Sequence, residues 1–304
     1  KEFEQLDCIQ NVEYVRIFEI DYTPNDPYWN QQWGLDAIET ALAYDLWNIE
    51  SGEIPGEMEV GDMVVGIPDN GFKWNHPDLV ENVWQNLGED ADGDGVVIVQ
   101  SGNSWIFDPG DVNGIDDDGD NYVDNFIGWD AAFNDNDPSP INASQDHGTE
   151  VGGCVSSSTD NGIGTASVGW SVKLMGVNAS TNESTVTDAS QATLAAAQMG
   201  ANVINMSWGS VGSCYPSEQN LMNAIFNNYG AILVTSAGNG GDDGFTNFID
   251  MSPSSCDNVV NVSAIDYNDN FGCWATAGPY VDLCAPGTNI MTTTNPSGYV
   301  SING

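Results

Sequence analysis

Short apolar runs alternate with stretches of helical spacing along most of the chain, and this alternation limits the fold more than any other feature. The apolar runs that indicate buried strands cover residues 64–67, 172–177, 203–206, 231–235 and 258–262. The stretches that indicate helices cover residues 147–157, 186–199 and 217–228. Strands that alternate with helices of this length form parallel βαβ units, and a parallel sheet is covered on both faces. The pattern therefore predicts an α/β fold with three layers, α/β/α, around a mainly parallel sheet. In such sheets the residues that bind ligands lie at the carboxyl ends of the strands.

Two regions fall outside this alternation. Residues 1–22 contain an alternating, strand-like run at 12–17, which a Pro-rich loop follows. Residues from about 85 to 145 are dense in Asp, Asn and Gly, and they indicate a long surface insertion. No apolar run is long enough to span a bilayer, so no membrane span is predicted.

Acidic residues greatly outnumber basic ones: 45 Asp and Glu against 4 Lys and Arg give a formal net charge of −41. Self-repulsion of this size weakens the folded state. Phosphate contacts need Lys and Arg, so nucleic acid is not expected as a partner. Two explanations stay open and are compatible. One is adaptation to salty surroundings, where counterions screen the repulsion. The other is binding of Ca²⁺ by some of the carboxylates.

The six cysteines include no CxxC pair, so a zinc or redox motif is not expected. Their pairing cannot be deduced from the sequence. Cys154 lies in a helical stretch of small residues, and we expect it to be a buried free thiol.

Three separated segments carry the residue types of nucleophilic catalysis. They follow an apolar run or begin a helix, and they are Asp69-Asn70-Gly71, His147-Gly148-Thr149 and Ser236-Ala237-Gly238-Asn239. A serine hydroxyl needs an adjacent base at neutral pH, and an imidazole titrates in that range. His76, the other histidine, belongs to a His-Pro-Asp-Leu turn close to Asp69 along the chain, and we assign it a structural role.

In this order and on these elements, the three segments resemble the subtilase family of serine peptidases. The segments at 162–164, 202–209 and 281–287 are also similar to that family, and the resemblance runs from about Thr23 to Gly304. It implies a secreted, extracellular serine endopeptidase that acts on polypeptides through an acyl-enzyme, without an organic cofactor. His147 would be the general base, Asp69 would orient it, and Asn239 would stabilise the oxyanion.

The resemblance also implies a substrate pocket. Its walls would be Ser207, Trp208 and Gly209 on one side, and Ala237 and Gly238, together with Ser236, on the other. Matching Ser252-Pro253 to an aromatic-Pro pair of the family puts Met251 near the pocket floor. A methionine there favours small or medium apolar residues before the scissile bond.

The chain departs from the family pattern at two places of interest. Glu150 replaces the second histidine of His-Gly-Thr-His, which is not a triad member. The nucleophile motif Gly-Thr-Ser-Met-Ala is represented only by Gly304, and Ser301 lacks its context. We expect the nucleophile to follow Gly304 and the 304-residue chain to be inactive alone. The alternative is a non-catalytic, calcium-stabilised binding module on a subtilase scaffold.

The resemblance divides the chain into two parts. Residues 1–22 would be the C-terminal remnant of an inhibitory propeptide and its linker, since the run at 12–17 resembles the last propeptide strand. The propeptide would make the protein a zymogen, cut between about residues 20 and 25. Residues 23–304 would form the catalytic domain, interrupted by the acidic insertion.

The insertion carries two Asp-rich loops. The first, Asp90-Ala91-Asp92-Gly93-Asp94-Gly95, is like the first half of an EF-hand loop, but Ser101 stands where the bidentate Glu is expected. In the second loop we predict Asp116, Asp118, Asp120 and Asp124 as ligands of a structural Ca²⁺. The alternative for both loops is a solvated acidic surface.

Overall fold

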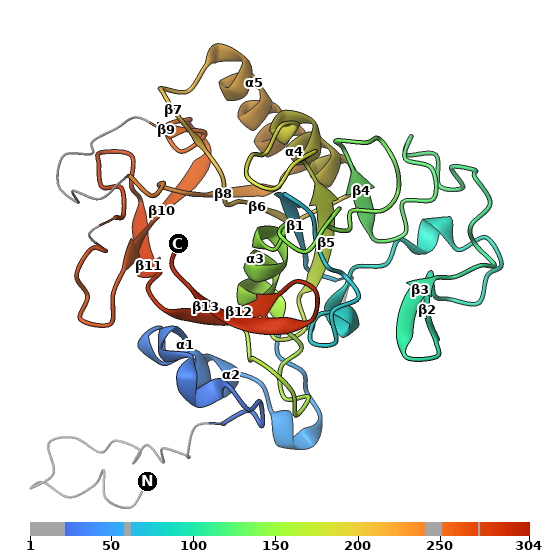
Figure 1. Cartoon of the computed structure of the whole chain (residues 1–304), viewed down its shortest axis with the longest axis horizontal. Helices are drawn as coiled ribbons and strands as arrows, with labels where there is room; N and C mark the ends of the chain where they lie inside the picture. Colours follow the sequence, from blue (N-terminus) through green and yellow to red (C-terminus); the bar gives the residue numbers. More distant parts are fainter. Residues whose placement is uncertain (1–21, 58–61, 241–250, 273) are drawn as a thin grey trace, which may run out of the picture.

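The computed structural model describes residues 22–57, 62–240, 251–272 and 274–304. Its centre is a seven-stranded sheet in the order β11-β10-β8-β6-β1-β5-β4 (Figure 1), in which every neighbouring pair is parallel. The strands are β1 (Val64–Asp69), β4 (Gly128–Asp130), β5 (Lys173–Asn178), β6 (Val203–Met206), β8 (Ile232–Ser236), β10 (Val259–Ile265) and β11 (Leu283–Pro286). The predicted parallel sheet is confirmed.

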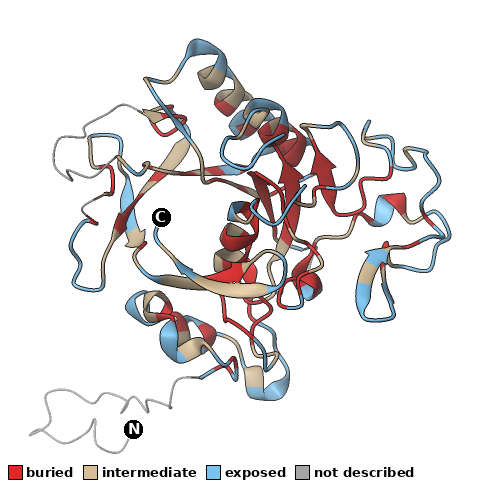
Figure 2. Cartoon of the chain, viewed as in Figure 1, coloured by how far each residue is buried: buried red, intermediate tan, exposed pale blue. Residues whose placement is uncertain are grey.

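Helices cover the sheet on both faces because the strand residues alternate between two hydrophobic clusters. Val64 of β1 packs with the alanines of α4 (Ala189–Gln198) and with Met222 of α5 (Pro216–Ala224). Val65, the next residue, belongs to the second cluster, where α3 (His147–Ser156) packs through Val151. All six residues of β1 are buried, as expected for a strand covered on both faces. Figure 2 shows the buried residues concentrated around β1, β5, α3 and α4. The predicted α/β/α layers are confirmed.

Smaller elements surround this framework. Three antiparallel pairs are β2 (Ile98–Ser101) with β3 (Ser104–Phe107), β7 (Ser210–Val211) with β9 (Met251–Ser252), and β12 (Ile290–Thr294) with β13 (Gly298–Ile302). The short helices are η2 (Trp29–Gln31), α1 (Trp33–Ala37), α2 (Thr40–Tyr44), η3 (Ile49–Ser51), η4 (Val80–Asn82), η5 (Leu87–Glu89) and the π-helical η6 (Ile225–Tyr229), which continues α5. None of the helices in the described residues has the length and apolar character needed to cross a bilayer.

The acidic range 85–145 differs from a simple surface insertion. Its β2–β3 hairpin and neighbouring loops lie to one side of the sheet (Figure 1). However, Phe126 and Ile127 are fully buried, and β4 joins the edge of the central sheet. This part of the range therefore belongs to the core. The run at 12–17, on which the propeptide prediction depends, lies outside the described residues.

Cys214 and Cys256 form a disulfide across 42 residues, which links the start of α5 to the segment after β9. Cys154 is a free thiol, as predicted, although it is half-buried rather than fully buried. Burial raises the pKa of this thiol, which disfavours the nucleophilic thiolate form.

Candidate active site

Asp69 ends the central strand β1, and His147 begins the helix that packs on that strand. The ring Nδ1 of His147 donates a hydrogen bond to Asp69 Oδ1 at 2.8 Å and lies 3.0 Å from Oδ2. Asp69 is buried, whereas 46% of the His147 side chain is exposed. The carboxylate therefore fixes one ring nitrogen from within the fold and leaves the other directed away from it.

Glycine permits this contact at the start of α3. A Cβ atom on Gly148 would lie 2.3 Å from the carbonyl oxygen of Gly71 and 2.9 Å from the Cβ of Asp69. Asn70 accepts a hydrogen bond from the Gly148 backbone N–H at 3.2 Å. The turn after β1 and the first turn of α3 therefore touch through their backbones, and this approach brings Asp69 and His147 together.

The opposite side of α3 is held by the β12–β13 hairpin. The hydroxyl of Thr292 donates to the carbonyl of Glu150 at 2.7 Å, and that of Thr293 donates to the carbonyl of Thr149 at 2.8 Å. The first turn of α3 thus lies fixed between the sheet and this hairpin.

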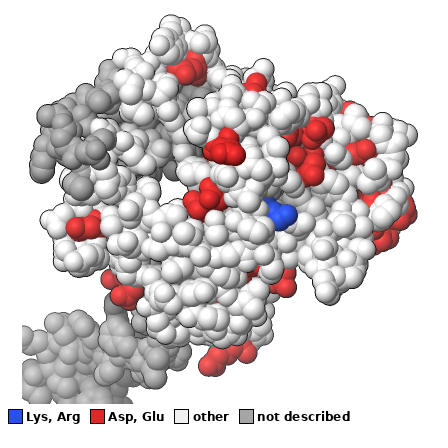
Figure 3. All heavy atoms as spheres, in the orientation of Figure 1, with Lys and Arg blue, Asp and Glu red and all other residues white. Residues whose placement is uncertain are grey.

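Negative charges surround the imidazole. The Asp69 carboxylate, with smaller contributions from Glu150 and Asp146, raises the pKa of His147 to about 9 against the opposing effect of burial. Glu150 is itself buried, and burial raises its pKa. In the part of the chain that the structure describes, His147 and Asp69 form the only ion pair. Figure 3 shows acidic side chains scattered over one face with hardly any basic ones.

A cavity of about 600 Å³ lies beside the pair of Asp69 and His147. Its further lining includes the predicted wall Ser207, Trp208 and Gly209, and the two acidic residues Glu183 and Glu218. Trp208 anchors that wall by donating its ring N–H to the carbonyl of Pro68 at 2.9 Å. Apart from Asp69, the lining of this cavity thus adds two further acidic side chains near His147.

Asn239 lies next to this site rather than in it. The residue is exposed and lines a second cavity of about 220 Å³, together with Ala237 and Gly238. Ser207 lines both cavities, so the two are neighbours. The structure thus brings Asp69 and His147 into contact and places Asn239 on the adjoining surface.

Met251 lies between the two predicted walls of the substrate pocket. Its Cε is 3.1 Å from the position of a Cβ on Gly238 and 3.6 Å from that of a Cβ on Gly209. Pairing of Val211 in β7 with Met251 in β9 holds it there. Two glycines thus face one flexible side chain, which fills the space between them.

His76 has the structural role that its turn predicted. The ring is fully buried, its Nε2 donates to the carbonyl of Gly298 at 3.1 Å, and its Nδ1 accepts from the backbone N–H of Asp78 at 3.0 Å. Both ring nitrogens are therefore occupied within the fold.

The four predicted metal ligands of the second acidic loop do not all belong to one cluster. Asp116 and Asp118 form a cluster with Glu89, in which one ligand atom of each lies within 4.8 Å of the others. Asp120 instead accepts from Asn125 at 2.9 Å, and Asp124 accepts from the backbone N–H of Gly114 at 3.0 Å. Sequence reasoning missed Glu89, because nothing in the spacing links it to a loop that begins at Asp116. A second cluster consists of Asp90, Asp92 and Asp111.

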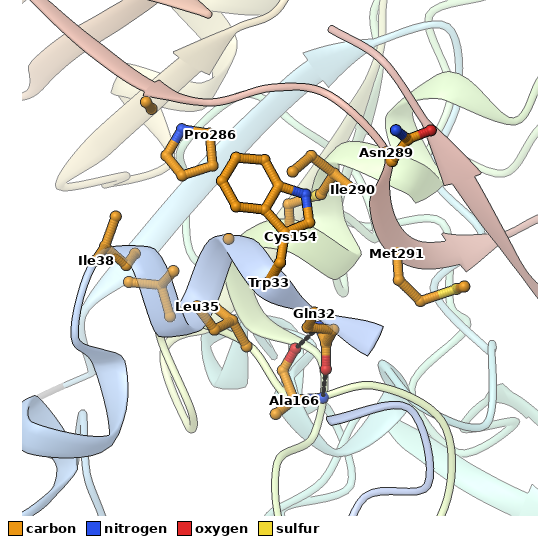
Figure 4. Close-up of a pocket in the computed structure, with 13 residues that line it drawn as sticks. Gln32, Trp33, Leu35, Ile38, Cys154, Ala166, Pro286, Asn289, Ile290 and Met291 are labelled. Atoms are coloured by element: carbon orange, nitrogen blue, oxygen red, sulfur yellow. Dashed lines mark hydrogen bonds between the residues drawn. The ribbon is translucent and has the colours of Figure 1, made fainter. Parts of the chain in front are cut away.

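A separate apolar cavity of about 180 Å³ lies between α1 and β12 (Figure 4). Trp33, Ile38, Pro286 and Ile290 line it, and Cys154 is the only titratable side chain among the described residues that line it. Gln32 fixes α1 beside it by exchanging two hydrogen bonds with the Ala166 backbone, at 2.7 and 2.9 Å. The described residues that line this cavity are thus mainly apolar and include no pair like Asp69 and His147.

Comparison with known proteins adds independent findings. The model of the subtilase family matches residues 61–304. The chain is 29% identical over 300 residues to the thermophilic serine proteinase of Bacillus sp. (strain AK1), covering 96% of this chain and 59% of the relative. It is 28% identical over 306 residues to the halolysin-like extracellular serine protease Nep of Natrialba magadii, covering 99% of this chain and 46% of the relative. The chain thus spans about half the length of these two relatives.

In two further matches the aligned region covers most of the other protein as well. The chain is 30% identical over 287 residues to thermitase of Thermoactinomyces vulgaris, covering 93% of this chain and 80% of thermitase. A solved structure of proteases from Pseudoalteromonas arctica PAMC 21717 has a TM-score of 0.60 at 24% identity, covering 93% of this chain and 82% of that one. At that identity the structural likeness supports the fold alone.

Proposed function

The chain belongs to the subtilase family, and on this premise we propose that it is the catalytic part of a secreted serine endopeptidase. Peptide bonds would be cleaved through an Asp-His-Ser triad and an acyl-enzyme. The observation that carries the proposal is the 2.8 Å contact between His147 Nδ1 and the buried Asp69 carboxylate beside a large open cavity.

The contact between Asp69 and His147 supports the roles proposed for these two residues. Because Nδ1 of His147 donates to Asp69, the neutral ring has Nε2 available to accept a proton. His147 would take the proton of the serine hydroxyl and later give it to the leaving amine, while Asp69 stabilises the imidazolium. The Asn239 side-chain amide would donate to the developing oxyanion. The serine is expected in the Gly-Thr-Ser-Met-Ala motif after Gly304.

The substrates would be polypeptides. Met251 between Gly209 and Gly238 favours a small or medium apolar residue before the scissile bond. Residues 1–22, as a propeptide remnant, would come from a segment that inhibits the enzyme until it is cut. The relative from Natrialba magadii is named as extracellular, and the Cys214–Cys256 disulfide suits an oxidising compartment. Both support secretion.

A structural Ca²⁺ belongs to the same proposal, at the second acidic loop. Carboxylate oxygens are the ligands that Ca²⁺ prefers, and Glu89 joins Asp116 and Asp118 there. Asp120 and Asp124 support this loop through the hydrogen bonds described above. No organic cofactor is proposed.

The non-catalytic binding module is not favoured. The relatives from Bacillus sp. (strain AK1) and Natrialba magadii are named as serine proteases, and the contact between Asp69 and His147 supports a catalytic role. The module would need a residue other than serine in the motif after Gly304.

The experiment is peptide hydrolysis by a chain extended through that motif. His147→Ala is expected to lower kcat by about 10⁶-fold, Asp69→Asn by about 10⁴-fold, and Asn239→Ala by roughly 10²- to 10³-fold. Ser301→Ala, an exposed serine of β13, serves as the control and is expected to retain full activity. Full activity of the His147→Ala variant would contradict the proposal.

A further inference from the structure

We infer that Asp90, Asp92 and Asp111 form a Ca²⁺ site of their own, separate from the cluster at Glu89. In this site Asp111 supplies the carboxylate that the EF-hand-like half-loop lacks within its own sequence.

Backbone N–H groups of the half-loop hold its first two carboxylates in place. Both oxygens of Asp90 accept backbone N–H groups, from Gly93 and from Gly95, each at 2.8 Å. Asp92 accepts from the backbone N–H of Asp94 at 3.1 Å. Gly95 has a φ of +94°, which an L side chain rarely adopts. The carboxylates of the loop are thus gathered, but a closing ligand is missing because Ser101 stands at its position.

The β2–β3 hairpin brings the closing ligand from farther along the chain. Ile98 pairs with Phe107 at the open end of the hairpin, and the backbone N–H of Asp108 donates to the carbonyl of Val97 at 2.9 Å. The chain therefore returns beside the half-loop immediately after the hairpin, and Asp111 lies in this returning segment.

Asp111 carries the observation that points to a ligand. Its side chain is fully buried, at 0% exposure. Its Oδ1 accepts from the backbone N–H groups of Ala91 at 2.9 Å and Asp92 at 3.2 Å, but its Oδ2 has no hydrogen-bond partner. One ligand atom each of Asp90, Asp92 and Asp111 lies within 4.8 Å of the others. A buried carboxylate oxygen without a partner is costly, and a cation held by the three carboxylates removes that cost.

The other acidic cluster does not share this feature. Both oxygens of Glu89 accept backbone N–H groups: Oε1 from Asp117 at 2.9 Å and Asp118 at 3.2 Å, and Oε2 from Asp124 at 2.9 Å. The unpartnered oxygen therefore distinguishes the site at Asp111.

The chemistry of the ligands selects Ca²⁺. The cluster offers carboxylate oxygens and no imidazole or thiolate, which suits a hard divalent cation rather than zinc. Mg²⁺ requires a near-ideal octahedral shell and gives up its waters reluctantly, whereas Ca²⁺ accepts irregular sets of oxygen ligands. Two segments separated by a hairpin form such an irregular set.

The test is calorimetric titration of the EGTA-treated protein with Ca²⁺ at high NaCl, where general screening is already saturated. Asp111→Asn and Asp92→Asn are each expected to lose one equivalent of bound Ca²⁺ relative to the wild type. Glu89→Gln is expected to keep this equivalent. Asp137→Asn, an exposed aspartate outside both clusters, removes the same charge and is expected to keep the full stoichiometry.

The variants also distinguish a loss of Ca²⁺ binding from a failure to fold. Asp92 is exposed, so its variant is expected to fold even if Asp111→Asn does not. Unchanged stoichiometry in a folded Asp92→Asn variant would overturn the inference, as would a wild-type protein that binds no Ca²⁺. Because the readout is bound cation, an inactive protease leaves this test unaffected.

Discussion

Gly148→Ala is a sensitive probe of the contact between Asp69 and His147, because it changes neither of them. The new Cβ would lie 2.3 Å from the carbonyl oxygen of Gly71, whereas ordinary contacts begin near 3.4 Å. The first turn of α3 must therefore move away from the turn after β1 by about 1 Å, since the atom that the new Cβ meets is backbone.

A displacement of this size has two measurable effects. Misplacement of a catalytic group by about 1 Å costs roughly 10²-fold in rate, so kcat is expected to fall by about that factor in the chain that carries the serine. The attraction of the Asp69 carboxylate for the imidazolium weakens with distance, so the pKa of His147 is expected to fall from about 9.

Both effects can be measured separately. Peptide hydrolysis gives kcat, and an NMR titration of the imidazole gives the pKa. The titration is simple to assign because the chain has 2 histidines and burial lowers the pKa of the other, His76. Gly298→Ala is the matched control, since its Cβ would meet only Thr294, at 3.5 Å. A Gly148→Ala enzyme with the wild-type kcat and an unchanged His147 pKa would refute the reasoning.

Other expected outcomes concern pH, stability and specificity. Only the neutral imidazole of His147 accepts a proton, so kcat/KM rises with pH through its pKa. Glu150→Gln removes one of the charges that raise this pKa, so the acid limb of the pH profile is expected to move to lower pH, and an unmoved limb would exclude Glu150 as a cause. Cys214→Ser/Cys256→Ser opens a disulfide that spans 42 residues; urea denaturation is expected to show a loss of roughly 4 kcal/mol, and equal unfolding midpoints would contradict this. Met251→Ala is expected to shift cleavage of a peptide library toward larger residues before the scissile bond; an unchanged library profile would remove Met251 from the pocket.

The central strands could be predicted from the sequence because burial on both faces leaves a clear pattern. Residues 203–206 were predicted as a strand and form β6, and the prediction for β5 was displaced by only one residue. β4 was missed because it has three residues, two of which, Gly128 and Asp130, are poor strand formers. Its place in the sheet depends on tertiary packing, which local sequence does not record.

The candidate site divides in the same way. Asp69 and His147 could be proposed from the sequence because both lie at the ends of regular elements. Asp69 lies at the carboxyl end of a strand, and His147 lies at the start of a helix. Asp111 and Glu89 could not, because the loops that they complete lie elsewhere along the chain. A hairpin separates Asp111 from the half-loop. A motif with fixed spacing therefore could not predict how far along the chain this ligand would lie.

The first turn of α3 is fixed on two sides, by the backbone of the turn after β1 and by the hydroxyls of Thr292 and Thr293. A segment held in this way opens only when its surroundings open, so its amide hydrogens are expected to exchange with solvent at the rate of global unfolding. Whatever adjustment a bound peptide demands must then come from the segments after β6 and β8. The enzyme would keep its proton-transfer groups rigid and move the walls of its cleft.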